Sequence, residues 1–124
     1  MTTTLPIHDI KADFFRVLGH PARVRILELL RDGDQTVGEL QTALALDSSG
    51  TSQHLAALRR TGIVEGRKEG TSVRYSVRDP RMFELLEIAR QIISSGLAET
   101  KALLEELSVP ETMPTHAEKP APRT

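Results

Sequence analysis

The sequence predicts a mainly α-helical domain with a small β-hairpin, and three observations support that fold class. The 124-residue chain is 39% hydrophobic but only 3% aromatic, so its core must consist of Leu, Ile, Val and Ala, as in small helical domains. Apolar residues recur at helical spacing over most of its length. One stretch around residue 75 instead alternates apolar and polar residues with the period of a strand.

The first two helices are bounded by characteristic start and stop residues. Apolar residues at three- and four-residue spacing predict a helix from Ile7 to Leu18, and Gly19 ends it. The pair His20–Pro21 starts the second helix, because the backbone of proline suits a first helical turn. We expect this helix to stop at Asp32–Gly33.

A capping box predicts the third helix. Thr36 and Glu39 stand three residues apart, so each side chain can accept a hydrogen bond from the other's backbone amide. The helix that follows should be short and extend to about Ala45.

The fourth predicted helix is capped at residue 47 or 48, extends to residue 60 or 61 and stops at Gly62. At about 100° per residue, Thr51, Leu55 and Leu58 share one face, which predicts that this face packs on the domain. The opposite face is small and polar, and it consists of Ser49, Ser52, Gln53, Ala56 and Arg60.

A hairpin and a long helix complete the predicted fold. The strands cover residues 63–68 and 73–77 and are joined across Glu69–Gly70, and the outward side chains are basic. The last helix runs from Met82 to Leu107 and is ~40 Å long at the usual rise per residue. It is therefore longer than one side of so small a domain can cover.

We expect one domain over residues 7–107, between a flexible segment 1–6 and a disordered tail 108–124 that holds four of the seven prolines. The absence of cysteine excludes disulfides, thiol nucleophiles and zinc–thiolate sites. No apolar run approaches the ~18 residues of a membrane span, and the start lacks the pattern of a signal peptide. A soluble cytoplasmic protein is predicted.

Charge is concentrated in one segment. The net charge of the chain is −1, but residues 59–81 hold seven basic and three acidic side chains. A local basic segment on a near-neutral chain indicates a local anionic partner.

Two short helices, a tight connection at residues 44–47, a polar-faced second helix and a basic hairpin predict a winged helix-turn-helix with five helices and a two-stranded wing. Such a helix fits the major groove of B-DNA, while hairpin arginines reach phosphates or the minor groove. Gln53 has the side chain that pairs with adenine. The predicted DNA-binding residues are Ser48, Ser49, Ser52, Gln53, His54, Arg60, Arg67, Lys68, Arg74 and Arg78.

Four motifs in order resemble the ArsR/SmtB-type bacterial transcriptional repressors. They are residues 14–30, 36–40, 49–58 with 61–64, and 67–75, and the resemblance covers about residues 7–107. It implies a homodimer that binds double-stranded DNA at an inverted-repeat operator and releases it on an unidentified signal. It also implies that the first and last helices form the dimer interface, with the residues Ile7, Ile10, Phe14, Leu85, Ala89, Ile92, Ile93 and Leu103.

The sequence departs from the metal-sensing members of that family. The family's Cys-x-Cys pair corresponds to Thr36 and Gly38, and the last helix has no histidine. We therefore predict no metal site. We also predict no cofactor and no enzymatic activity. Two alternatives stay open: a metal-responsive repressor with non-thiol ligands such as His8, His20 or His116, and a protein-interaction module that has lost DNA binding.

Overall fold

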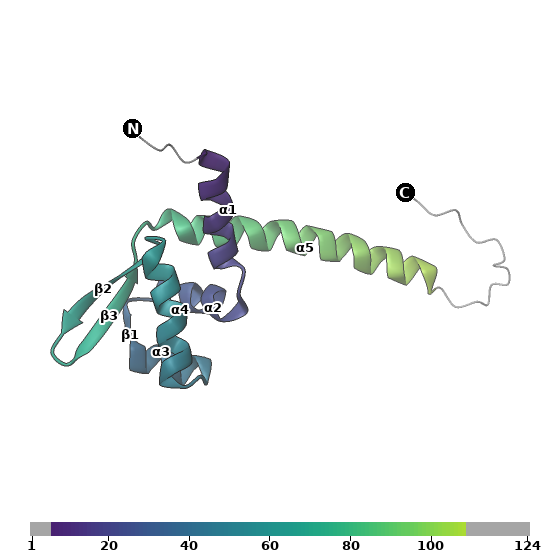
Figure 1. Cartoon of the computed structure of the whole chain (residues 1–124). Helices are drawn as coiled ribbons and strands as arrows, with labels where there is room; N and C mark the ends of the chain where they lie inside the picture. The colour runs from purple at the N-terminus through teal and green to yellow at the C-terminus, as the bar shows by residue number, and fades with distance from the viewer. Residues whose placement is uncertain (1–5, 109–124) are drawn as a thin grey trace. The chain divides into compact units, whose positions relative to one another are not determined.

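The computed structural model describes residues 6–108, which form five helices and a three-stranded antiparallel sheet (Figure 1). Two compact units make up the chain, one extending to Leu85 and the other starting at Leu86. The predicted flexible and disordered segments lie outside the described residues, except for Pro6 and Ser108. The elements are α1 (Ile7–Leu18), α2 (Pro21–Arg31), β1 (Gln35–Thr36), α3 (Val37–Leu44), α4 (Ser48–Arg60), β2 (Val64–Glu69), β3 (Ser72–Val77) and α5 (Arg81–Leu107).

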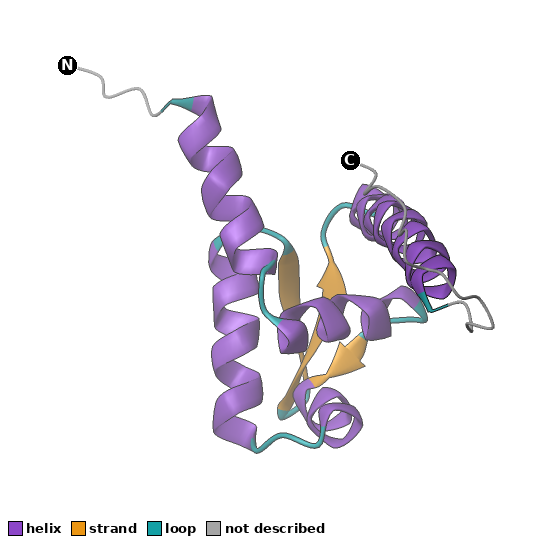
Figure 2. Cartoon of the chain, turned by 90° about the vertical axis from the view of Figure 1, so that its right-hand side faces the viewer, coloured by secondary structure: helices purple, strands orange, loops and turns teal. Residues whose placement is uncertain are grey.

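The mainly helical fold class is confirmed, and most of the ribbon in Figure 2 is helix. The wing is present as β2 and β3, which pair antiparallel from Val64 opposite Val77 to Glu69 opposite Ser72. The sheet also contains a third strand, β1, which pairs with the other edge of β3. The sequence did not predict β1, because a strand of two residues is too short to show any periodicity.

Side-chain caps begin α2, α3 and α4 where the sequence predicts these helices to start. His20 caps α2, and the capping box of Thr36 and Glu39 closes with donor–acceptor distances of 3.2 and 2.9 Å. Asp47 caps α4. Between α3 and α4, Ala45 has a φ of 56°, the left-handed conformation that ends many helices. These local signals set the tight turn that joins α3 to α4.

The core of the first unit holds α4 by its predicted inner face. Thr51, Leu55 and Leu58 are at most 1% exposed, and the Thr51 hydroxyl donates to the Asp47 carbonyl at 2.9 Å. The fixed inner face leaves the opposite face of α4 pointing to solvent. Other fully buried side chains are Ile26, Leu27, Leu40 and Val64.

A glycine lets the wing pack tightly. A Cβ atom at Gly66 would lie 2.9 Å from Val73 Cγ1 and 3.0 Å from Tyr75 Cε1, closer than side chains tolerate. The Tyr75 ring, which is 6% exposed, therefore packs over the bare backbone of the opposite strand. At the tip, Gly70 adopts a φ of 65° in a two-residue turn with Thr71, one residue later than predicted.

Candidate nucleic-acid interface

The outer face of α4 is exposed and carries mostly small side chains. Ser49, Ser52, Gln53 and Ala56 are all exposed, as their spacing predicts. Within residues 6–108, the side chains of Ser52 and Gln53 make no hydrogen bond to another part of the protein. Their donors and acceptors are therefore available to base edges.

The first turn of α4 adds donors for a phosphate. Ser48 and Ser49 are exposed there, and a helix N-terminus favours negative charge. Asp47 already accepts a hydrogen bond from the Gly50 amide at 2.7 Å, so the serine hydroxyls provide the additional polar contacts.

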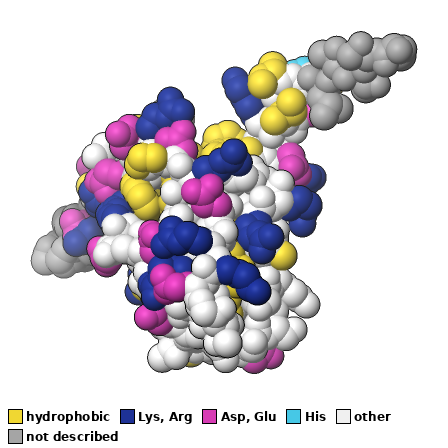
Figure 3. All heavy atoms as spheres, turned by 90° about the vertical axis from the view of Figure 1, so that its left-hand side faces the viewer, with side chains coloured by type: hydrophobic (Ala, Val, Ile, Leu, Met, Phe, Trp, Pro, Cys, Tyr) yellow, Lys and Arg dark blue, Asp and Glu magenta, His cyan; other side chains and the backbone are white. Residues whose placement is uncertain are grey.

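Four of the predicted basic contacts are exposed. Arg60 lies in the last turn of α4, Arg67 and Lys68 lie on β2, and Arg78 follows β3. On the face that Figure 3 shows, Lys and Arg side chains are exposed with Asp and Glu side chains among them. Long exposed cations of this kind can reach phosphates.

Arg74 differs from these four residues, because its guanidinium is bound within the protein. Its Nε donates to Glu69 Oε1 at 2.8 Å and its Nη1 donates to the Asp34 carbonyl at 3.0 Å. Nη1 also lies 3.7 Å from Glu39 Oε1. The hydrogen bond from Arg74 lowers the pKa of Glu69. Arg74 therefore ties the wing to the segment before α3, which sequence reasoning did not foresee.

His54 also has partners inside the protein. The side chain is half-buried, and its Nδ1 accepts a hydrogen bond from Arg23 Nε at 3.2 Å. Its ring centroid lies 4.3 Å from that of His20. Burial lowers the pKa of His54, and the neighbouring His20 and Arg23 lower it further. His54 thus packs against α2, away from the outer face that holds Gln53.

We expect acid to destabilise the protein through His54. A histidine whose pKa is lower in the folded state binds fewer protons there, so the free energy of unfolding falls as pH drops through the ordinary value of 6.5. Urea unfolding at pH 7.5, 6.5 and 5.5 measures this loss. The variant His54→Gln should show a weaker pH dependence over this interval, and an identical dependence in both proteins would contradict the assignment.

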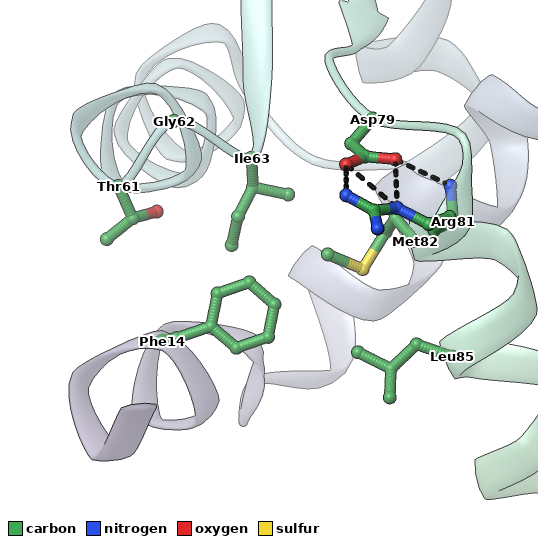
Figure 4. Close-up of a pocket in the computed structure, with 8 residues that line it drawn as sticks. All are labelled: Phe14, Thr61, Gly62, Ile63, Asp79, Arg81, Met82 and Leu85. Carbon is green, nitrogen blue, oxygen red and sulfur yellow. Dashed lines mark hydrogen bonds and ion pairs between the residues drawn. The ribbon is translucent and has the colours of Figure 1, made fainter. Parts of the chain in front are cut away.

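The first unit also contains a cavity of about 390 Å³ that was not predicted from the sequence (Figure 4). An ion pair flanks it, in which Arg81 Nη2 donates to Asp79 Oδ2 at 2.6 Å and lowers the Asp79 pKa to about 2. Two predicted dimer-interface residues, Phe14 and Leu85, meet at this cavity. The lining residues are Phe14, Thr61, Gly62, Ile63, Asp79, Arg81, Met82 and Leu85.

Apolar side chains of the predicted dimer interface are exposed in the single chain. In the first unit Ile7 and Ile10 are exposed on α1, and in the second unit Ile92 is 67% and Ile93 59% exposed on α5. Large exposed apolar patches mark interaction sites. Leu103 is also exposed, whereas Phe14, Leu85 and Ala89 are partly buried.

Neither a membrane span nor a metal cluster is found in the described residues. No helix within residues 6–108 is long and apolar enough to cross a bilayer. Nor does that part of the chain group three His, Cys, Asp or Glu side chains to hold a metal ion. Of the histidines considered as non-thiol ligands, His20 packs against the His54 ring and His8 Nε2 lies 3.9 Å from Asp9 Oδ1. His116 falls outside the described residues.

Comparison with known proteins gives consistent matches. Residues 20–66 match the family described as "Bacterial regulatory protein, arsR family". The chain is 46% identical over 103 residues to the "Uncharacterized HTH-type transcriptional regulator Rv0081" of Mycobacterium tuberculosis, covering 82% of this chain and 90% of the relative. It is 34% identical over 90 residues to the "Probable mercury resistance operon repressor" of Streptomyces lividans, covering 73% and 72%.

Solved structures agree with these sequence matches. The crystal structure of Mycobacterium tuberculosis Rv0081 superimposes with a TM-score of 0.73 at 44% identity, covering 78% of this chain and 98% of that one. The homodimeric winged helix-turn-helix DNA-binding domain of Mycobacterium bovis Mb0332, solved by NMR, gives a TM-score of 0.69 at 26% identity. That match covers 80% of this chain and 95% of the other.

Proposed function

Because this chain belongs to the arsR family of bacterial regulatory proteins, and is thus a DNA-binding transcriptional regulator and not an enzyme, we propose that it represses transcription as a homodimer bound to an inverted-repeat operator in the cytoplasm. The observation that carries this proposal is the exposed polar face of α4, fixed by a buried opposite face and flanked by an exposed basic wing. The name of the Streptomyces lividans relative supports repression.

We infer that α4 and the wing have different roles in DNA binding. Gln53, with Ser52 and Ser49 beside it, reads base edges in the major groove. Arg67 and Lys68 hold phosphates and supply the salt-dependent part of affinity. In this proposal Ser48, Arg60 and Arg78 add phosphate contacts, whereas Arg74 and His54 act through the protein because their side chains have internal partners.

In the proposed dimer the apolar residues of α1 and α5 face their counterparts in a second copy. The homodimeric Mycobacterium bovis domain supports this arrangement. Two-fold symmetry places one recognition helix on each half of an inverted repeat, so the operator should mirror the dimer.

Replacing Gly96 tests this interface, because the substitution should stabilise an isolated helix but weaken the dimer. A Cβ atom at Gly96 would meet nothing within 4 Å in the single chain, so Gly96→Ala should stabilise an isolated helix by ~0.5–1 kcal/mol. At about 100° per residue, however, Gly96 lies in the apolar face of α5 between Ile92 and Ile93. We expect Gly96→Ala to weaken the dimer in sedimentation equilibrium, because a partner helix packs closely there. A tighter dimer would contradict this.

Metal ions should not act as the signal. Stoichiometric zinc, nickel or cadmium should change operator affinity by less than ~1 kcal/mol, below the ~1–3 kcal/mol of a typical allosteric coupling. The reason is the lack of cysteine in the chain and of histidine in α5. Fluorescence anisotropy of labelled operator with and without each metal measures the effect, and chelator-reversible release would identify a non-thiol metal site.

Selection of bound fragments from sheared genomic DNA of the source organism tests the function itself. The purified full chain should enrich short inverted repeats near promoters, and Gln53→Ala should lose that enrichment while still retaining DNA. Failure of the wild-type protein to enrich any symmetric sequence would favour the interaction-module alternative.

A further inference from the structure

One arginine side chain joins three helices of the first unit. Arg23 belongs to α2, its Nη1 donates to the Val17 carbonyl of α1 at 3.2 Å, and its Nε donates to His54 Nδ1 of α4 at 3.2 Å. Both hydrogen bonds are partly buried. The guanidinium is rigid and planar, so these two bonds fix α1 and α4 relative to one another.

The bond to α1 satisfies a carbonyl that the backbone cannot satisfy in the usual way. α1 ends at Leu18, so the Val17 carbonyl has no donor within its helix, and the residue four positions on, Pro21, has no N–H. Val17 is 3% exposed, so water has little access to it. Arg23 supplies the missing donor, and its charge also suits a helix C-terminus.

The bond to α4 requires a neutral His54. An imidazole nitrogen that accepts a hydrogen bond carries no proton, so His54 holds its proton on Nε2. His20, which caps α2 through its own Nδ1, packs against the His54 ring. His20 and Arg23 are the titratable and charged groups that act on His54, and both oppose its protonation.

We propose that Arg23 is a positioning residue for DNA binding: through Val17 and His54 it fixes the recognition helix α4 relative to the dimer helix α1, and so sets the distance between the two recognition helices of the dimer. The inference rests on the proposed function, because it takes α1 as a dimer element and α4 as the reading helix. Arg23 itself touches no base or phosphate in this role.

The test uses the operator recovered by genomic selection, with the spacing between its half-sites lengthened or shortened by one base pair. Wild-type protein should prefer the native spacing sharply. Arg23→Ala should bind the native operator about tenfold more weakly but lose little further affinity on the altered spacings. Arg25→Ala is the matched control, because Arg25 is exposed on the same helix and its Nη1 donates to the exposed Glu28 Oε1 at 3.4 Å.

Two further readouts separate positioning from other roles. The salt dependence of binding should be the same for Arg23→Ala and wild type, since Arg23 neutralises no phosphate in this role. His54→Gln, whose side-chain oxygen can still accept from Arg23, should keep the sharp spacing preference, whereas His54→Leu should flatten it. The two His54 variants also serve if Arg23→Ala fails to fold.

The inference is overturned if Arg23→Ala and His54→Leu keep the wild-type spacing profile, or if Arg23→Ala makes the salt dependence shallower. Failure of the wild-type protein to bind any inverted repeat would instead overturn the proposed function. The two failures are therefore distinguishable in one experiment.

Discussion

Replacing Ile92 and Ile93 together with glutamate should separate the dimer into monomers or unfold it. In the single chain these side chains are 67% and 59% exposed, so charge at either position would cost a monomer little. In the proposed dimer the four isoleucines of the two copies would be covered, and each fully buried side chain contributes ~1.5–3 kcal/mol. A loss of only ~4 kcal/mol would raise the dimer Kd about a thousandfold.

Sedimentation equilibrium at micromolar protein measures this effect, with circular dichroism to follow folding. Ala98→Glu is the matched control, because at about 100° per residue Ala98 lies roughly opposite the two isoleucines on α5 and is also exposed. We expect that control to remain dimeric. If the double variant dimerised as tightly as wild type, α5 would not be part of the interface.

Gln53→Ala should cost ~1–3 kcal/mol on the operator and little on unrelated DNA, because removal of a base-reading side chain reduces specificity. Gln53 is exposed on the outer face of α4, so its truncation leaves the buried face unchanged. Ala56 shares that outer face, and Ala56→Ser is a control that adds a small polar group without removing a bidentate partner.

Arg67→Ala should weaken binding to both sequences about equally. It should also make the dependence of log affinity on log salt shallower by ~0.9 for each phosphate that the protein no longer neutralises. Arg67 is the appropriate wing residue for this test, since Arg74 is held by Glu69 and the Asp34 carbonyl. Anisotropy titrations over a salt series separate the two variants. Weaker binding of Gln53→Ala to both sequences, or an unchanged salt slope for Arg67→Ala, would contradict the proposed orientation on DNA.

The helices and the inner face of α4 could be predicted from the sequence alone. Caps such as Thr36 with Glu39 act between residues three positions apart, so the pattern that encodes them is contiguous. The burial of Thr51, Leu55 and Leu58 follows from helical periodicity for the same reason. The exposed polar face is the side of α4 opposite the buried one. The candidate DNA-reading surface could therefore be predicted from the same periodicity.

The internal partners of the polar side chains on the candidate surface, by contrast, depend on the packing of distant elements. The sequence analysis grouped His54 and Arg74 with the other predicted DNA-binding residues, yet His54 bonds to Arg23, 31 residues away, and Arg74 bonds to Asp34, 40 residues away. The strand β1 likewise exists only through its pairing with β3. Local propensity encodes elements, whereas contacts across such separations depend on how the elements pack, which no short pattern specifies.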